Sequence, residues 1–319
     1  MTNHTSEQPL GTDRSDTEPS NTKPSNTERK GMVIGIDGTP ASVAAARWAM
    51  AHTDAFGPIR PVYTWSIPAM AIAGTPLGFA PAPPVAEMEA AAERAAAVYA
   101  EDLGLDPADI PIVQGDPGTV LCELATDASL LVVGTRNRGT LRANFLGSVG
   151  RYCADHTPVP LIIVPADSEQ RLEADRPVVV GVDGSSNSLS ALRWAATAFN
   201  DAPITAVTSW QTPVDGPVMF GGGRFDLKAF RAQAATVAEE TVAKASAELG
   251  IDEDRFNRKV VEGDPRWTLH SEQPDAGLLV VGQRGRGGLA HLVLGSTTTS
   301  LIHRPDCPIA VIPCDTDNV

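Results

Sequence analysis

The sequence predicts an α/β fold of two tandem domains, each built from a five-stranded parallel sheet with helices on both of its faces. From Gly31 onward, short β-branched runs alternate with alanine-rich helical stretches, which is typical of strand and helix units around a parallel sheet. The same order of runs then occurs a second time along the chain. The 319 residues, of which 42% are hydrophobic, suffice to fill two ordinary domain cores.

Each element follows from a local pattern. The first strand is an apolar run that ends near Ile36, and Thr39 is a typical cap for the helix that follows. The second helix closes at Gly104, Asp116 and a proline open the third, and the fourth begins at Gly147. The expected elements of the first copy are strands near 32–37, 59–65, 110–114, 130–134 and 160–164, and helices near 41–54, 85–103, 117–127 and 147–156. Those of the second copy are strands near 177–183, 203–210, 258–262, 277–282 and 308–313, and helices near 187–199, 226–249, 265–272 and 295–304.

Changes in composition divide the chain into four segments. Residues 1–30 are polar and charged, with Leu10 almost the only large apolar side chain, so we expect a disordered tail. Residues 31–165 are predicted to form the first domain and residues 176–314 the second. The polar stretch 166–175 is expected to link them.

Charge and cysteine content exclude several classes of partner. The formal net charge of −14 opposes attraction to nucleic acid or to an anionic membrane. No stretch approaches the roughly 18 apolar residues that a membrane span needs. The four cysteines, which are scattered, fit neither a zinc site nor a redox pair and are interpreted as reduced packing residues. We therefore expect a cytoplasmic protein without nucleic-acid or membrane partners.

One motif carries most of the chemistry and occurs in both copies. The fourth strand ends at a glycine-rich, cationic loop, and a helix begins at a Gly-Ser pair after it. Such loops let main-chain amides approach an anion, and the helix start and the arginines add donors and positive charge. The candidate phosphate-binding residues of the first copy are Gly134, Thr135, Arg136, Asn137, Arg138, Gly139, Thr140, Gly147, Ser148 and Val149. Those of the second copy are Gly282, Gln283, Arg284, Gly285, Arg286, Gly287, Gly288, Gly295, Ser296 and Thr297.

A carboxylate follows the first strand of each copy. Asp37 comes after Gly35, and Asp183 comes after Gly181. If strands one and four are neighbours, this carboxylate and the glycine-rich loop face one crevice, which suits a nucleotide with its ribose or a metal ion near the aspartate. The structural alternative is that the glycines serve turn geometry alone and that the aspartate begins a helix. The occurrence of both motifs in both copies favours one nucleotide per domain.

Phosphate contacts alone do not hold a nucleotide. A helix end supplies about 0.3–1 kcal/mol, whereas micromolar affinity needs about 8 kcal/mol. The base must therefore be buried too, and Val62 and Val207 on the second strands are candidates to line its pocket.

The second loop resembles the ATP-binding signature of the universal stress protein family. Two residues separate Gly282 from Gly285, and nine residues separate Gly285 from the pair Gly295-Ser296. The first copy departs at Asn137, which stands where the family has its second glycine. The resemblance implies strand order 3-2-1-4-5, a pseudo-twofold relation between the domains, and ATP in each of them. It also implies that the fifth strands pair within one chain.

The expected function is regulatory. The sequence contains no Walker A motif, serine nucleophile elbow, HExxH helix or paired catalytic carboxylates, which disfavours a dedicated enzyme. We expect ATP, with or without Mg²⁺, to control binding to regulatory protein partners in stress or growth arrest. Two alternatives stay open, a slow ATP hydrolase or self-phosphorylating protein in which Asp37 or Asp183 holds magnesium, and a nucleotide-free dimerisation scaffold. Whether two tandem chains form a homodimer also stays open.

Overall fold

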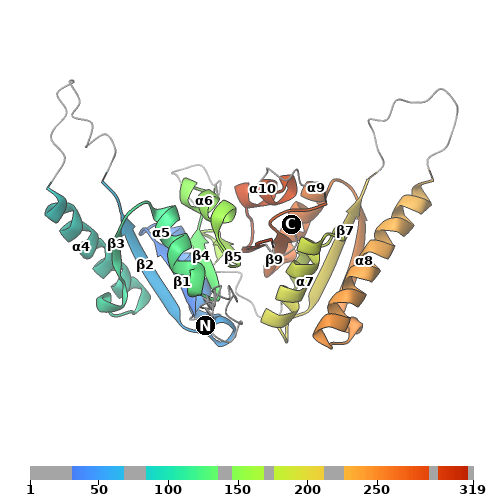
Figure 1. Ribbon diagram of the computed structural model, residues 1–319, viewed down its shortest axis with the longest axis horizontal. Helices are drawn as coiled ribbons and strands as arrows, with labels where there is room; N and C mark the ends of the chain where they lie inside the picture. The colour runs from blue at the N-terminus through green and yellow to red at the C-terminus, as the bar shows by residue number, and fades with distance from the viewer. Residues whose placement is uncertain are drawn as a thin grey trace, which may run out of the picture.

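The protein consists of two similar halves that stand side by side and share one sheet (Figure 1). The computed structural model describes residues 31–67, 84–135, 146–168, 176–211, 226–286 and 294–314. The predicted tail, 1–30, and most of the predicted linker lie outside the described residues. Among the helices that are described, none has the length and apolar character needed to cross a membrane.

The helices and strands occur in the expected order, with bounds that agree with the predicted ones to within a few residues. The first half contains β1 (Met32–Ile36), α1 (Pro40–Met50), α2 (Thr53–Phe56), β2 (Ile59–Trp65), α4 (Val85–Leu103), β3 (Ile112–Gln114), α5 (Pro117–Leu124), β4 (Leu130–Gly134), α6 (Ser148–His156) and β5 (Leu161–Val164). The second half contains β6 (Val178–Gly181), α7 (Ser186–Ala198), β7 (Ile204–Trp210), α8 (Leu227–Leu249), β8 (Phe256–Glu262), α9 (Pro265–Glu272), β9 (Leu278–Gly282), α10 (Ser296–His303) and β10 (Ile309–Ile312).

The first helix is shorter than predicted. Instead of running to residue 54, α1 ends at Met50, and a separate turn, α2, follows. The ring nitrogen Nδ1 of His52 lies 2.7 Å from the carbonyl oxygen of Trp48, which the His52 amide would bond in a continuing helix. That amide donates instead to the carbonyl of Ala49 at 3.0 Å, and the tighter turn ends the helix.

The predicted caps determine where several helices begin and end. The Thr39 side chain accepts a hydrogen bond from the amide of Ser42 at the start of α1, and the Asp116 side chain does the same for Thr119 at the start of α5. Gly104 ends α4 in the left-handed region with φ of 67°. Because only glycine adopts this conformation at little cost, the residue fixes the end of the helix.

The sheet has ten strands in the order β3-β2-β1-β4-β5-β10-β9-β6-β7-β8. Each half therefore has the order 3-2-1-4-5 with parallel strands, as the resemblance implied. The halves meet at β5 and β10, which pair antiparallel with Ala310 opposite Ile162. The prediction that the fifth strands pair within one chain is confirmed. The pairing leaves neither of these apolar strands as an exposed edge.

Two apolar layers cover the sheet, one on each face, and each runs through both halves. One layer includes Trp48 of α1 and Leu192 of α7, and the other includes Leu121 of α5 and Leu301 of α10. These four side chains are almost completely buried. Since apolar burial contributes roughly 25 cal/mol per Å², the continuous layers hold the two halves together.

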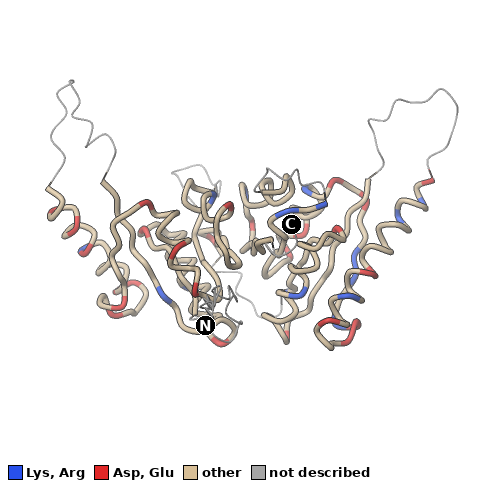
Figure 2. The backbone as a smooth tube through the Cα atoms, viewed as in Figure 1, with Lys and Arg blue, Asp and Glu red and all other residues tan. Residues whose placement is uncertain are grey.

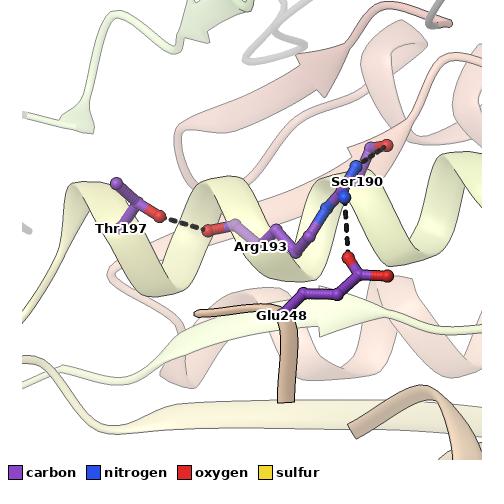
Figure 3. Close-up of polar contacts among 4 residues, drawn as sticks. All are labelled: Ser190, Arg193, Thr197 and Glu248. Atoms are coloured by element: carbon purple, nitrogen blue, oxygen red, sulfur yellow. Dashed lines mark hydrogen bonds and ion pairs between the residues drawn. The ribbon is translucent and has the colours of Figure 1, made fainter. Parts of the chain in front are cut away.

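Charged groups lie mainly on the outer helices and loops, where acidic residues are spread over both halves (Figure 2). One ion pair joins α7 to α8, with Arg193 and Glu248 2.7 Å apart (Figure 3). The Arg193 guanidinium also donates to the Ser190 hydroxyl at 3.1 Å. Because these side chains are about one third exposed, the pair contributes only about 0–1 kcal/mol.

An aromatic cluster joins the halves beside α2. The Phe56 ring lies 5.8 Å from the ring centroids of both Trp194 and Phe199 in the second half. His52 stacks on Trp48 at 4.1 Å and meets Phe199 edge-on at 5.9 Å. Such ring pairs contribute about 0.5–1.5 kcal/mol beyond area burial, so the cluster strengthens the contact between halves.

His52 should make this contact sensitive to acid. Burial lowers the pKa of His52, and the hydrogen bond to the Trp48 carbonyl offsets this only in part. The unfolded chain takes up a proton near pH 6.5, but the folded chain resists it, so stability is lost as the pH falls below about 6.5. Urea unfolding at about pH 7.5 and about pH 5.5 should show a smaller loss for His52→Phe than for the wild type. Equal losses of stability in the variant and the wild type would contradict this role of His52.

Candidate functional site

A cleft of about 540 Å³ opens at the carboxyl ends of β6, β7 and β9 in the second half. Helices α8 and α9 and the start of α10 complete its walls. The strand order reverses between β6 and β9, and this is where ligands bind in an open parallel sheet. The volume falls within the roughly 300–1,000 Å³ of small-molecule sites. The predicted site residues that line the cleft are Gly181, Asp183, Gly282, Arg284, Gly285, Arg286, Gly295, Ser296 and Thr297.

The loop after β9 passes so close to its neighbours that two positions require glycine. A Cβ atom on Gly282 would lie 3.0 Å from backbone atoms of Asn187 in α7, and one on Gly285 would lie 2.6 Å from Oδ2 of Asp183. The Asn187 amide Nδ2 donates to the carbonyl of Arg284 at 3.2 Å. The two glycines therefore let the loop pass between α7 and the Asp183 carboxylate.

Asp183 fastens this loop. Its Oδ1 accepts from the amide and the hydroxyl of Ser185 at 3.0 and 2.6 Å, and its Oδ2 accepts from the amide of Arg286 at 2.9 Å. Burial raises the pKa of Asp183, but hydrogen bonds from the Ser185 hydroxyl, the Ser185 amide and the Arg286 amide outweigh it and leave the pKa below its ordinary value. The ionised carboxylate thus joins the loop after β6 to the loop after β9, which is a positioning role.

Helix α10 directs its amino end at the cleft. Its N-cap, Gly295, offers no side-chain cap, and Ser296 and Thr297 of the first turn line the cleft. The Thr298 hydroxyl donates to the carbonyl of Gly282 at 2.8 Å and fastens the helix to the end of β9. An uncapped helix start presents amide donors and a positive dipole end, which attract an anion.

The rest of the cleft is mainly apolar. Val207 and Trp210 of β7 and Phe230 of α8 line it, and Val207 was among the residues that the sequence suggested for the base pocket. The Oγ1 hydroxyl of Thr208 in the same wall is buried and has no hydrogen-bond partner among the described residues. A buried hydroxyl without a partner is costly, and the residue that carries this one lines the cleft.

Gln283 has a different role from its neighbours in the loop. Its side chain is 7% exposed and lies outside the cleft lining. Nε2 donates to the carbonyl of Ala154 at the end of α6 at 2.9 Å, and Oε1 accepts from the amide of Cys314 at 3.3 Å. The side chain therefore joins the two halves, which its place between Gly282 and Arg284 in the sequence did not reveal.

Replacing Gln283 with alanine should destabilise the protein. The change removes both hydrogen bonds and leaves buried backbone groups without partners, which costs about 1–3 kcal/mol. Gln233→Ala is the control, because that glutamine is exposed on α8 and its loss should cost less than about 0.5 kcal/mol. Urea unfolding compares the two variants, and equal stability would contradict the bridging role.

The predicted carboxylate and strand-end residues of the first half lie at the equivalent places. Gly35 lies in β1, and Asp37 after it is exposed, with Oδ1 accepting from the amide and hydroxyl of Thr39 at 3.0 and 2.7 Å. Gly134 at the end of β4 lies against the first turn of α1. Thr135 after it is buried, and its Oγ1 has no partner among the described residues.

The first loop is described only at its ends. Gly147 caps α6, and Ser148 and Val149 form its first turn, as Gly295, Ser296 and Thr297 do in α10. The predicted residues that lie outside the described residues are Arg136, Asn137, Arg138, Gly139 and Thr140 in the first loop and Gly287 and Gly288 in the second.

Sequence reasoning missed most of the cleft wall. The additional lining residues include Ser188, Thr208, Ser209, Trp210, Phe230, Gln233, Ala234, Val237, Leu269 and Leu294. Several come from the first turns of α8, which follow a long stretch without a recognisable pattern. Their only signal is position, at the end of the second strand and the start of the second helix, where a parallel sheet places its ligand.

The two 3-2-1-4-5 halves and the cleft at a reversal of strand order define a tandem doubly wound α/β protein with a site at the switch point. The sequence pattern of the universal stress protein family matches residues 28–165 and 176–313, so the chain belongs to this family.

Relatives of similar length share this organisation. A universal stress protein of Mycolicibacterium smegmatis is 27% identical over 300 residues, which cover 88% of this chain and 96% of the relative. One of Mycobacterium tuberculosis is 28% identical over 300 residues, with 88% and 95% covered. The crystal structure of a universal stress protein from Archaeoglobus fulgidus superposes with a TM-score of 0.59 at 17% identity and covers 88% of this chain and 97% of that one. This last likeness shows the same fold.

Proposed function

We propose that the protein binds ATP in the cleft of its second half and acts as a nucleotide-dependent regulator. The observation that carries this proposal is the meeting of three anion-binding features at one cleft. They are the glycine-rich loop held by Asp183, the uncapped start of α10 and the side chain of Arg286. Main-chain amides in such places bind phosphate without a Walker A lysine.

The energies require the base to be bound as well. Charge-assisted hydrogen bonds contribute about 1.5–3 kcal/mol each and the helix end about 0.3–1 kcal/mol, against about 8 kcal/mol for micromolar affinity. Burial of a base against Val207, Trp210 and Phe230 adds an apolar contribution. ATP should therefore bind much more tightly than inorganic triphosphate.

The site residues fit binding better than hydrolysis. Across the described ranges, no group of three or more His, Cys, Asp and Glu residues is arranged to hold a metal ion. Both oxygens of Asp183 accept hydrogen bonds from the protein, Oδ1 from Ser185 and Oδ2 from the amide of Arg286. Mg²⁺ would arrive with the triphosphate, where it neutralises phosphate charge.

Regulation requires that ATP favour one state of the protein over another. Gln283 lies in the same loop as Gly282 and Arg284 and bonds to α6 of the first half. A nucleotide that binds to this loop therefore also affects the contact between halves, and a protein partner in the cytoplasm would recognise the resulting state.

Two measurements test the proposal. Purified protein, when denatured, should release adenine nucleotide that mass spectrometry detects. Titration calorimetry with ATP and Mg²⁺ should give binding in the micromolar range, about −8 kcal/mol, and much weaker binding of inorganic triphosphate. Protein that releases no nucleotide and gives no heat with ATP would contradict the proposal.

A further inference from the structure

The two halves differ at the predicted crevices although their strands correspond. The carbonyls of Trp65 in β2 and Trp210 in β7 accept the same backbone hydrogen bond, from the glycine after the next strand, at 2.9 and 2.8 Å. This correspondence places Tyr63 in the first half where Thr208 stands in the second. Thr208 lines the open cleft, so the first half has a bulky ring at a position where the second half has a small side chain.

Tyr63 is part of a stacked pair. Its ring centroid lies 6.3 Å from that of Tyr99 of α4, with the ring planes 16° apart. Both tyrosines are half-buried and pack against the apolar layer that contains Ile36. Tyr63 pairs with Ile36, the last residue of β1, and burial, Tyr99 and Asp37 all raise the pKa of Tyr63. The rings therefore stand at the carboxyl end of β1, where the first crevice was predicted.

The Tyr99 hydroxyl occupies a place that an arginine takes in the second half. A Cβ atom on Gly38 would lie 1.4 Å from Oη of Tyr99, so the hydroxyl covers that face of the glycine. The corresponding Gly184 is covered by the Arg286 guanidinium, whose Nη2 would lie 2.1 Å from such a Cβ. A neutral hydroxyl in the first half thus stands where the second half has a cation beside its cleft.

Other residue differences between the halves also disfavour nucleotide binding in the first half. Gly104 ends α4 and Gly250 ends α8, so residues at the same distance before these glycines correspond. The cleft residues Gln233 and Ala234 of α8 thus correspond to Glu87 and Met88 of α4. The glutamate adds a negative charge that repels a triphosphate, and the methionine adds bulk. At the helix starts, Thr297 corresponds to Val149, which has no hydroxyl to offer to phosphate.

We propose that the chain binds one nucleotide, in the second half, and that Tyr63 and Tyr99 close the first crevice against nucleotide. The inference rests on the proposed function. It adds the number of nucleotides bound per chain and the residues that determine this number. Bulk at Tyr63 and Met88 removes space for a base, and Glu87 in place of Gln233 opposes the phosphates. The first half is then a fixed support for the nucleotide-binding half.

Titration calorimetry on the full chain with ATP and Mg²⁺ measures the stoichiometry directly. The expected result is one nucleotide per chain. Two equivalent nucleotides per chain would overturn this inference and leave the proposed function standing. Absence of any binding would overturn both, so the two failures are distinguishable.

Paired exchanges test the named residues. Thr208→Tyr places the first half's ring in the cleft and should weaken ATP binding by about 30-fold or more. The mirror variant Tyr63→Thr should change affinity by less than about twofold and keep the stoichiometry at one, because Tyr99, Glu87 and Met88 remain. Gln233→Glu changes an exposed position with little risk to folding and should weaken ATP binding by about threefold. Unchanged affinity in both second-half variants, or a large loss in Tyr63→Thr, would overturn the inference.

Discussion

Replacing Asp183 with asparagine is expected to weaken ATP binding by about 10- to 100-fold. The carboxylate accepts from both donors of Ser185 on one oxygen and from the amide of Arg286 on the other. An asparagine has one acceptor, so its amide group must face either Ser185 or the Arg286 amide with donor against donor. The variant loses hydrogen bonds that hold the loop after β9 in place, so part of the free energy of ATP binding must be used to position this loop. Calorimetry on folded variant protein measures the loss.

Asp37→Asn is the matched control for this variant. Oδ1 of Asp37 accepts from the amide and the hydroxyl of Thr39, and an asparagine oxygen can keep both hydrogen bonds. If only the second half binds nucleotide, this variant should bind ATP within about twofold of the wild type. Equal affinities of Asp183→Asn and Asp37→Asn would contradict the role of Asp183.

Gly134→Ala is expected to reduce the free energy of unfolding by about 3 kcal/mol. The added methyl group would lie 2.4 Å from the carbonyl carbon and oxygen of Ala41 and 2.8 Å from the amide nitrogen of Ser42. These are backbone atoms in the first turn of α1, so no side-chain rotation relieves the contact, and the helix must move away from the sheet. Urea unfolding monitored by circular dichroism measures the change.

Gly104→Ala separates this steric cost from the cost of losing a glycine. Gly104 has φ of 67°, and no atom lies within 4 Å of its would-be Cβ, so alanine there should cost only about 1–2 kcal/mol of backbone strain. Gly134→Ala should therefore be clearly less stable than Gly104→Ala. If Gly134→Ala were instead the more stable variant, α1 would move away from β4 at little cost, and the close packing at Gly134 would not matter for stability.

Local patterns in the sequence were enough to predict the helices and strands and the parallel sheet in each half. Apolar β-branched runs gave the strands, and Thr39, Asp116 and Gly104 act at helix ends as their chemistry predicts. The strand order and the pairing of β5 with β10 came from the resemblance to the universal stress protein family, and the pairing leaves neither apolar strand as an exposed edge. The exception at α1 arose from a side-chain contact, between His52 and the Trp48 carbonyl, that no periodicity reports.

The candidate site was predicted less completely. Glycines and charged residues of the second loop were found because their spacing has a direct chemical meaning, and nine of the predicted residues line the cleft. Phe230 and Trp210 look like ordinary core residues in the sequence. The side chain of Gln283 was misplaced because its partners, Ala154 and Cys314, are distant in sequence. The difference between the halves depends on Tyr63 and Tyr99, whose stacking emerges only when β2 and α4 pack.

A crystal structure of the full chain grown with ATP and Mg²⁺ tests the central claim most directly. The account predicts a nucleotide in the second half, with its phosphates on the Arg286 guanidinium, the Gly285 amide and the amides of the first turn of α10, and its base against Trp210 and Phe230. It also predicts that the Tyr63 and Tyr99 rings stay stacked and that the first crevice holds no nucleotide. Density for ATP away from the second loop, or none at all, would contradict it.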